Sequence, residues 1–434
     1  MVNMLHLNDA AGTFPPSLYA SNVEFPPERP SLRGETRADV CIVGAGFTGI
    51  VAALELRARG YDVVVLEAHR VGWGASGRNG GQVSSGHHKS QTWLEKRVGR
   101  ATAKQMWDLG EDAKKLVRSL SAEHAPDANF RSGIAGGCYK SGDIKELEAE
   151  ADLLRKHYDY DDFHALNRAD FSNLVRSPLY ACGSIDRGAG HIHPLHQILG
   201  LGRAAEAAGV RIFERSEVLD IAHGEPATVI AKEGQVVASY VVLAGNGYLP
   251  HIVPEVACRV MPINSFIGAT QPIPNRQRDI LSEDIAAFDG SHVVNYFRFE
   301  GGRFLFGGRA NYSVKFPKDM AGTLHTRMVE MFPQLNDVTF DFVWGGTLGV
   351  TMTRLPALFR VRRNVLSASG YSGQGVALSH ISGHVLAEAI AGDSEKFDVL
   401  SLLPGRPFPF GRHLQGSTMA LAMAWYRLRD RLGV

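Results

Sequence analysis

The sequence predicts an α/β protein with a discontinuous Rossmann-like nucleotide-binding domain and a second, α+β domain built on an antiparallel or mixed sheet. Residues 38–67 show the apolar strand, glycine-rich turn, amphipathic helix and second apolar strand of a βαβ unit. A helix at 195–208 and two later strands resume the same pattern. Residues 293–299 and 303–308 instead read as a hairpin, joined at Glu-Gly-Gly, of a second sheet.

The first βαβ unit carries a nucleotide-binding fingerprint. Residues 44–49 read Gly-Ala-Gly-Phe-Thr-Gly and follow the strand at 38–43. We expect Gly44 to form the tight turn, Gly46 to let the backbone approach a pyrophosphate, and Gly49 to let the helix pack closely on the strand. The N-terminus of the helix then presents free N–H groups to the phosphates.

The second strand of the unit, at 62–67, ends in an acidic residue. Glu67 is placed to accept hydrogen bonds from an adenosine ribose, and its charge disfavours a 2′-phosphate. The fingerprint fits FAD and NAD equally well, because both contain the same ADP half.

The remaining segments divide the chain into an arm, two interleaved domains and a tail. Between residues 92 and 156 the pattern is mainly helical, with helices at 103–122 and 145–156 that we expect to insert away from the nucleotide-binding sheet. Strands at 210–213 and 236–244 return to that sheet. The expected ranges are an extended N-terminal arm at 1–37, a nucleotide-binding domain at 38–91, 185–255 and 340–395, a substrate-binding domain at 92–184 and 256–339, and a C-terminal tail at 396–434.

Composition excludes several classes of partner. The formal net charge of 434 residues is only +1, which does not indicate nucleic-acid binding. No window approaches the roughly 20 apolar residues of a membrane span, and prolines in the first 30 residues would interrupt a signal helix. The four cysteines are far apart and no zinc-type spacing occurs, so we expect reduced thiols, no metal site and a cytoplasmic protein that acts on small molecules.

Three glycine-rich segments resemble those of the D-amino acid oxidase (DAO) superfamily of flavoproteins. They are residues 72–82 (Gly-Trp-Gly-Ala-Ser-Gly-Arg-Asn-Gly-Gly-Gln), 241–249 (Val-Val-Leu-Ala-Gly-Asn-Gly-Tyr-Leu) and 368–376 (Ala-Ser-Gly-Tyr-Ser-Gly-Gln-Gly-Val). The resemblance implies FAD as the cofactor of the nucleotide-binding domain. The residues that it implies for FAD binding, besides those of the fingerprint, are Ser76, Arg78, Asn79, Gly80, Gly81, Gln82, Gly245, Gly373, Gln374 and Gly375.

Narrower features resemble one bacterial branch of this superfamily, the oxidoreductases that act on gamma-glutamylputrescine. They are residues 188–195 (Gly-Ala-Gly-His-Ile-His-Pro-Leu), Ser379-His380, Gly383 and the terminal segment 426–434. The likeness implies oxidation of a carbon–nitrogen bond in polyamine catabolism. A neutral amine would give a hydride equivalent from its α-carbon to flavin N5, the imine would hydrolyse, and oxygen or another acceptor such as a quinone would reoxidise the flavin.

The resemblance also suggests candidate residues around the flavin. Tyr296 and Arg298 alternate on the expected hairpin strand, which forms a roof over the flavin in this superfamily, and Arg298 could hold a substrate carboxylate or form a surface salt bridge. His191 and His193 could line the site or bind a metal, but capping and packing a turn is the simpler role. Arg354 could contact flavin or substrate, or fix a turn.

Residues 345–356 contain no cysteine, although some relatives carry a flavin-linked cysteine in this region. We therefore expect noncovalent FAD.

Two other functions remain open from the sequence. An oxidase or dehydrogenase of amino or imino acids, such as pipecolate, proline or sarcosine, would need a firm carboxylate clamp. A noncatalytic flavin-binding protein would explain why no catalytic side chain is certain. The sequence does not decide between oxidase and dehydrogenase, and it leaves the oligomeric state open.

Overall fold

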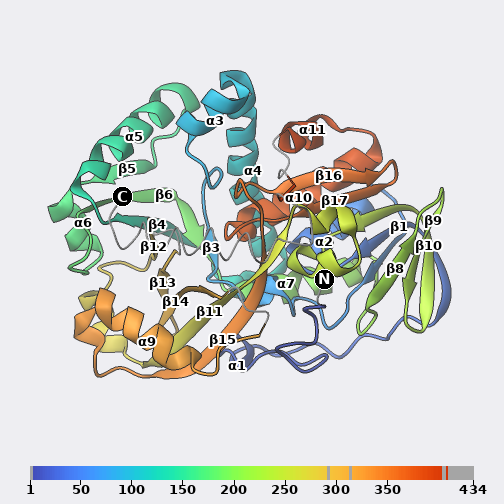
Figure 1. Cartoon of the computed structure of the whole chain (residues 1–434), viewed down its shortest axis with the longest axis horizontal. Helices are drawn as coiled ribbons and strands as arrows, with labels where there is room; N and C mark the ends of the chain where they lie inside the picture. The colour runs from blue at the N-terminus through green and yellow to red at the C-terminus, as the bar shows by residue number, and fades with distance from the viewer. Residues whose placement is uncertain (1–2, 291–293, 312–314, 403–406, 409–434) are drawn as a thin grey trace.

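The computed structural model describes residues 3–290, 294–311, 315–402 and 407–408. Two sheets organise this part of the chain and appear on opposite sides of the molecule in Figure 1. Val293 of the expected hairpin and the terminal segment 426–434 lie outside the described residues. Within the described residues, no helix is long and apolar enough to cross a membrane.

The first sheet has eight strands and is centred on parallel pairs. Its main path runs β16-β17-β10-β1-β2-β7, with β8 and β9 joined to the side of β10. The strands are β1 (Gly34–Val43), β2 (Val63–Leu66), β7 (Arg211–Phe213), β8 (Val218–Ala222), β9 (Ala227–Ala231), β10 (Gly234–Leu243), β16 (Ala357–Arg362) and β17 (Val365–Ser369). The last four residues of β1 and all of β2 are buried, as expected for parallel strands that are covered on both faces.

The order of the strands places a binding edge at the carboxyl ends of β1, β2 and β10. β1 pairs in parallel with β2 on one side and with β10 on the other. The turn at Gly44, the carboxylate of Glu67 and the turn at Gly245 therefore follow neighbouring strands at one edge of the sheet. This edge is where open α/β sheets bind nucleotides.

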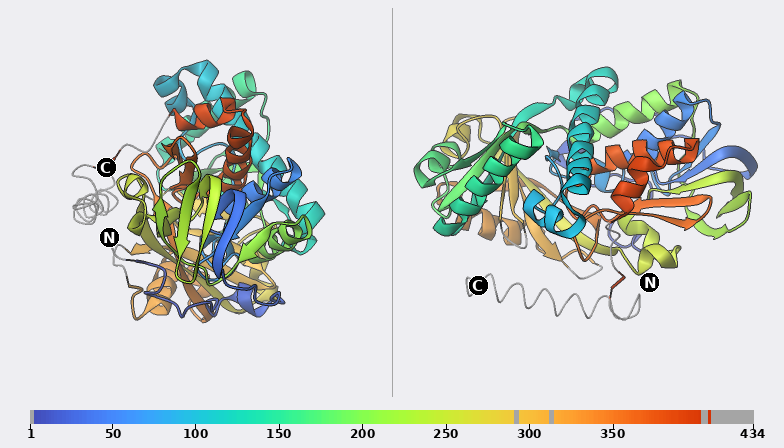
Figure 2. Two further views of the ribbon diagram at one scale, coloured as in Figure 1. Left: turned by 90° about the vertical axis from the view of Figure 1, so that its right-hand side faces the viewer. Right: turned by 90° about the horizontal axis from the view of Figure 1, so that it is seen from above.

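Some of the helices pack against the first sheet in one continuous apolar core, and others pack against the second sheet. The helices are α1 (Leu18–Ser21), α2 (Phe47–Ala58), α3 (Gln91–Val98), α4 (Arg100–His124), α5 (Ile144–Tyr158), α6 (Arg168–Leu174), α7 (Pro194–Ala207), α8 (Pro254–Ala257), α9 (Met320–Met331), α10 (Gly375–Ala391) and α11 (Glu395–Ser401). Buried residues of α2, α4, α7 and α10 share a core cluster with β1 and β2. Figure 2 shows these helices together beside the sheet.

The expectation for the helix at 103–122 needs correction. This helix exists within α4, but it does not insert away from the nucleotide-binding sheet. Its apolar side chains, among them Met106, Leu109 and Val117, belong to the same core as α2 and α10. An amphipathic pattern shows that one face is buried, but it does not identify the surface on which that face packs.

The second sheet has nine strands, mostly antiparallel, with one parallel pair between β12 and β4. Its path is β15-β11-β14-β13-β12-β4-β6-β3, with β5 beside β6. The strands are β3 (Gln82–Val83), β4 (Arg131–Cys138), β5 (Phe163–Leu166), β6 (Cys182–His191), β11 (Met261–Pro272), β12 (Ala286–Asp289), β13 (Tyr296–Glu300), β14 (Arg303–Asn311) and β15 (Phe340–Val350). The predicted hairpin is confirmed as β13 and β14, which pair in antiparallel register from Tyr296↔Gly307 to Glu300↔Arg303.

The two sheets do not follow the expected ranges at every point. β3, most of β6 and β15 lie in ranges that were assigned to the nucleotide-binding domain, yet these strands pair within the second sheet. Their partners are distant in the sequence; β15, for example, pairs with β11 from Met261↔Val350 onward. Local pattern does not specify such long-range partners, so the position of these strands required the folded structure.

The contact between α2 and α10 depends on a glycine. A Cβ at Gly383 would lie 2.6 Å from the Thr48 carbonyl oxygen and 2.9 Å from the Ala52 nitrogen. We expect Gly383→Ala to lower the free energy of unfolding by about 1–3 kcal/mol. The backbone atoms that the new Cβ would meet cannot rotate away from it as a flexible side chain can. This loss exceeds the roughly 1 kcal/mol that alanine gains over glycine in a helix. Thermal unfolding checks the result against Gly142→Ala, whose Cβ would meet nothing within 4 Å. Equal melting temperatures for the two variants would contradict the prediction.

Candidate functional site

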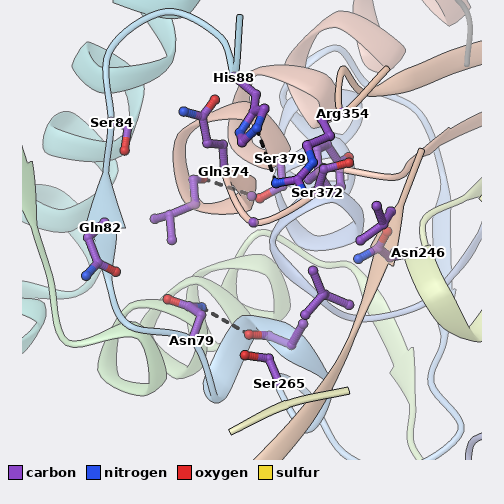
Figure 3. Close-up of a pocket in the computed structure, with 18 of the residues that line it drawn as sticks. Asn79, Gln82, Ser84, His88, Asn246, Ser265, Arg354, Ser372, Gln374 and Ser379 are labelled. Carbon is purple, nitrogen blue, oxygen red and sulfur yellow. Dashed lines mark hydrogen bonds between the residues drawn. The ribbon is translucent and has the colours of Figure 1, made fainter. Parts of the chain in front are cut away.

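A cavity of about 1160 Å³ extends from the binding edge of the first sheet to the inner face of the second sheet. It has three parts. The first part is lined by the fingerprint turn and Glu67, the second by the loop at 72–82 and the turn at 371–376, and the third by β4, β6, α3 and α5. Figure 3 shows the second part, with Gln82 and Ser84 on one wall and Gln374, His88 and Arg354 on another.

The fingerprint glycines occupy positions where a side chain would clash. Gly44 has φ of +106°, and a Cβ there would lie 3.0 Å from the Ala244 carbonyl carbon and oxygen. A Cβ at Gly49 would lie only 1.9 Å from the Gly44 carbonyl oxygen. The tight turn and the close approach of α2 to the strand are thus both present.

Gly46 is the N-cap residue of α2 and has no side chain that could cap the helix. The Ser76 hydroxyl takes this role, because it accepts a hydrogen bond of 2.9 Å from the Phe47 N–H. A Cβ at Gly46 would lie 2.8 Å from that hydroxyl oxygen. Ser76 keeps its own proton for donation to a ligand, and the first turn of α2 leaves further N–H groups toward the cavity.

Glu67 lies in the cavity wall directly after β2. Its carboxylate accepts hydrogen bonds from the Ala45 N–H at 2.8 Å and the His69 N–H at 2.9 Å. Burial raises the pKa of Glu67 to about 7, despite these two N–H groups, which lower it. Each carboxylate oxygen has a second lone pair, so the group can also accept from a sugar hydroxyl.

The N-terminal arm covers this first part of the cavity. Leu5 and Glu217 line the wall, and Glu217 accepts hydrogen bonds from Asn3 at 2.7 Å and from His6 at 2.8 Å. Further along the arm, the Trp73 indole N–H donates to the Thr13 carbonyl at 2.8 Å. Sequence reasoning expected an arm that wraps over a surface, but it did not identify Glu217.

Arg78 and Asn79 of the glycine-rich loop have different roles. The Arg78 guanidinium lies over the Trp73 ring and donates to the Trp73 carbonyl at 2.6 Å and to Asp9 at 2.7 Å, whereas its buried Nη2 has no partner. Within the loop, both N–H groups of the Asn79 amide donate to carbonyls, and Oδ1 accepts from the Gly81 N–H. Asn79 lines the cavity, and only the second lone pair of Oδ1 remains for a ligand donor.

Gly80, Gly81 and Gln82 bring the loop under the second sheet. A Cβ at Gly80 would lie 2.8 Å from the Tyr296 ring, and one at Gly81 would lie 2.1 Å from the Ile192 carbonyl oxygen. Gln82 lines the cavity, and its buried Nε2 has no hydrogen-bond partner.

The second glycine-rich turn directs the start of α10 at the cavity. Gly373 has φ of +100°, Gln374 is the N-cap without a side-chain cap, and α10 begins at Gly375. The buried Oε1 of Gln374 has no partner. Gly245 lies in the same wall, beside Asn246, whose side chain accepts from the Gly370 N–H at 2.8 Å.

These features fit an elongated dinucleotide with a flat ring. Five buried polar atoms without hydrogen-bond partners belong to described cavity-lining residues, namely Arg78 Nη2, Gln82 Nε2, His87 Nδ1, Gln91 Oε1 and Gln374 Oε1. Two helix N-termini, those of α2 and α10, also face the cavity. Unpaired buried polar groups cost free energy that a polar ligand removes. The wall thus supplies partners for phosphates and for ring heteroatoms.

Among the expected catalytic residues, Tyr296 lines the cavity. Its ring lies over Gly307, where a Cβ would be 2.1 Å away, and its hydroxyl is 3.5 Å from the Ser265 hydroxyl. Burial raises the pKa of Tyr296 to about 12. The hydroxyl is therefore a neutral hydrogen-bonding group near neutral pH.

Arg298 lies behind the cavity wall. Its guanidinium is fully buried and donates to the Gly80 carbonyl at 2.8 Å, to the Tyr19 hydroxyl at 3.2 Å and to the Glu300 carboxylate. The option that Arg298 holds a substrate carboxylate is not borne out, because the guanidinium is buried outside the cavity lining and is already paired. Its observed role is to tie the loop at Gly80 to β13.

His191 and His193 also lie outside the cavity wall. His191 is fully buried near the end of β6, and burial lowers its pKa to about 3. The option that His191 lines the site is not borne out, because its ring is fully buried outside the cavity lining, with both ring nitrogens lacking a hydrogen-bond partner among the described residues. His193 is the N-cap of α7 and accepts from the His196 N–H at 3.2 Å, which confirms the simpler role that the sequence suggested for it.

The structure adds lining residues that sequence reasoning missed. His87 and His88 lie in the wall, and His88 Nε2 is 3.4 Å from the Arg354 guanidinium. Asp186 and Glu150 also line the third part of the cavity. Their segments carry no motif, so only the spatial arrangement identifies them. Within the described part of the chain, no group of three or more His, Cys, Asp or Glu side chains is placed to hold a metal ion.

Comparison with known proteins gives consistent matches. Residues 39–389 match the DAO family, described as FAD dependent oxidoreductase. The chain is 36% identical to a probable oxidoreductase, OrdL, of Rhizobium meliloti (strain 1021), covering 96% of this chain and 97% of the relative. It is 34% identical to gamma-glutamylputrescine oxidoreductase of Escherichia coli (strain K12), covering 96% and 99%. The crystal structure of glycine oxidase from Geobacillus kaustophilus superposes with a TM-score of 0.69 at 21% identity, covering 82% of this chain and 95% of that chain.

The contact at Gly49 gives a direct test of the dinucleotide site. We expect Gly49→Ala to reduce the flavin content per chain at least about tenfold, which corresponds to about 1.4 kcal/mol of lost binding free energy. The new Cβ would lie 1.9 Å from the Gly44 carbonyl oxygen, so the turn would have to open to accommodate it. The ratio of visible to ultraviolet absorbance of the purified protein measures flavin content. Gly142→Ala is the control, and full flavin content in Gly49→Ala would contradict the assignment.

Proposed function

The chain belongs to the DAO family of FAD-dependent oxidoreductases, which act on amine or amino-acid donors, and we propose that it oxidises a carbon–nitrogen bond in gamma-glutamylputrescine or a related polyamine derivative. The similarity to the relative of that name supports this substrate. So does the charge of the third part of the cavity. The carboxylates of Glu150 and Asp186 line this part, together with Lys89 and with Asp289, which lies 4.0 Å from the Arg327 guanidinium.

The acidic wall is the observation that carries the proposal. Carboxylates favour a cationic ligand, whereas an amino-acid oxidoreductase needs a cation that holds the substrate carboxylate. Arg298, the expected clamp, is paired with Glu300 behind the wall. The arginines among the described lining residues are Arg78 and Arg354, and both line the second part of the cavity.

The residues around the glycine-rich turns would hold the cofactor. When bound, FAD supplies the electron acceptor for a hydride equivalent from the carbon beside the amine nitrogen. The first turn of α2 and Ser76 would hold the pyrophosphate, and Glu67 would accept hydrogen bonds from the ribose. The N-terminus of α10 would supply N–H donors and a positive dipole end toward negative charge on the flavin ring.

Tyr296 and its neighbours enclose the reacting part of the site. The Tyr296 ring packs against Gly80 and Gly307, so its phenol edge is fixed above the loop that faces the flavin position. A fixed and largely dry wall orients the amine for transfer. We propose that Tyr296 contacts substrate or flavin through its ring and neutral hydroxyl.

The flavin is proposed to bind without a covalent link. Cys41 is buried within β1 and burial raises its pKa, while burial also raises the pKa of Cys138 to about 12. Cys138 lines the cavity, but a thiol with this pKa does not form a nucleophilic thiolate near neutral pH. No cysteine lies in residues 345–356.

A second candidate function is the oxidation of an amino or imino acid. The observation in its favour is the position of Arg354, which lines the cavity beside His88 and could meet a carboxylate. The acidic third part of the cavity opposes this alternative.

Anaerobic reduction of the flavin tests the proposed function. We expect gamma-glutamylputrescine or another polyamine derivative to bleach the flavin absorbance at least about tenfold faster than glycine, proline, sarcosine or pipecolate, since tenfold corresponds to about 1.4 kcal/mol. Faster bleaching by the amino and imino acids would favour the second candidate. If no compound bleached the flavin, a noncatalytic role would follow. Hydrogen peroxide release in air then distinguishes an oxidase from a dehydrogenase.

The pH dependence should report the substrate amine. We expect kcat/KM to rise about tenfold per pH unit from pH 6 to pH 8, because the reacting amine must be neutral and alkylamines have pKa values near 10. Burial, and then the Arg354 charge, lower the pKa of His88 to about 4, so His88 is neutral over this range. The phenol of Tyr296 stays protonated. The pKa of Glu67, about 7, lies within this range. Because Glu67 is proposed to bind the adenosine ribose, the flavin content is measured at each pH as a control. A profile that falls with rising pH would contradict the prediction.

A further inference from the structure

We propose that Asp186 binds an ammonium group of the substrate other than the nitrogen that is oxidised. This inference rests on the proposed function and defines its substrate class further. Asp186 lines the third part of the cavity, although most of its side chain is buried. Its carboxylate is held by groups that position it without neutralising its charge.

The strand register directs Asp186 at the cavity. Side chains alternate along β6, so Asp186 shares a face with Ser184, which also lines the cavity, while Ile185 packs into the core of the second sheet. The partners of Asp186 on the adjacent strands are Ile134 of β4 and Phe163 of β5. Both partners line the cavity as well, so the carboxylate lies between two apolar neighbours.

One carboxylate oxygen of Asp186 takes up the available donors. Oδ1 accepts from the Tyr160 hydroxyl at 2.5 Å and from the N–H groups of Gly188 and Ala189, each at 3.1 Å. Within the described part of the chain, no hydrogen bond or ion pair is recorded for Oδ2 of this residue. The wall therefore fixes Oδ1 and leaves Oδ2 for a ligand.

The groups behind Asp186 supply no surplus positive charge. The Lys114 ammonium donates to the Tyr160 hydroxyl at 2.9 Å and to the Ser85 hydroxyl at 2.6 Å, and its ion-pair partner is Glu111 at 2.9 Å. The cluster thus combines two carboxylates with one ammonium. With both carboxylates ionised, it retains one negative charge beside the cavity.

An ionised carboxylate in a largely buried wall is costly unless it is paired. A ligand ammonium at Oδ2 supplies the missing partner and forms a charge-assisted hydrogen bond. The substrate class that fits is an amine with a second cationic group along its chain, such as a diamine or an aminoacylated diamine. One nitrogen meets the flavin position and the other meets Asp186.

Matched substrates test this assignment in the wild-type protein. The probes are the diamines from 1,3-diaminopropane to 1,6-diaminohexane and gamma-glutamylputrescine, each diamine being compared with the monoamine of equal carbon number. Anaerobic flavin reduction gives the limiting rate and the apparent Kd for each probe. We expect at least one diamine to exceed its monoamine by about 10- to 100-fold in rate over Kd, the range expected for a hydrogen bond to a charged group.

Asp186→Asn removes the charge while Oδ1 keeps its position for the three donors. We expect this variant to lose the advantage of the diamine, mainly through Kd, with a smaller effect on the monoamine. Asp162→Asn is the matched control, because Asp162 is exposed and close to Gly188 but does not line the cavity. The control should keep the full diamine advantage.

The outcomes separate this inference from the proposed function. Equal rates for diamines and monoamines in the wild type, or equal losses for both in Asp186→Asn, would overturn the assignment of Asp186. If no amine reduces the wild-type flavin, the proposed function fails. Titration of the flavin spectrum with 1,4-diaminobutane then decides the inference by itself: binding that is lost only in Asp186→Asn supports it, and binding that is absent or equal in both variants overturns it.

Discussion

The close packing of α2 against α10 is the constraint on which the rest of the site depends. Gly383 lets the backbone of α10 approach Thr48 and Ala52 of α2, and the Thr48 hydroxyl lies 2.7 Å from the Tyr371 hydroxyl in the turn before α10. The Thr48–Tyr371 contact lies near the start of both helices, and the N-termini of both helices line one cavity. A single contact therefore places two sources of N–H donors and positive dipole along one ligand.

The loop at 72–82 connects this helix pair to the second sheet. Ser76 bonds to the start of α2, Arg78 reaches the Gly345 carbonyl of β15 at 3.1 Å, and Arg298 of β13 bonds to the Gly80 carbonyl. The buried Arg298 thus has a structural function that explains its full set of partners. The loop therefore fixes β13 and β15 of the second sheet relative to the start of α2. A flexible surface loop would not need these bonds.

The cavity wall carries positive groups in its first two parts and carboxylates in its third part. Helix N-termini and Arg78 face the proposed positions of the phosphates and the flavin, while carboxylates line the third part. An anionic cofactor and a cationic substrate can therefore occupy adjacent parts without competing for the same groups. This arrangement supports the proposal of an amine donor, and it does so through residues that belong to no recognisable motif.

The sequence by itself determined the α/β class, the fingerprint and its glycine roles, the β13–β14 hairpin and the family. These features arise from local rules: side-chain period, turns that require glycine, and the spacing of a strand, a turn and a helix. Only the tertiary structure decided which sheet β6 and β15 join, that α4 packs on the nucleotide-binding core, and that Arg298 and His191 lie outside the cavity lining. It also brought Asp186 and Glu150 together from separate segments. Each of these outcomes depends on contacts between residues far apart in the chain, and local patterns do not encode the partner.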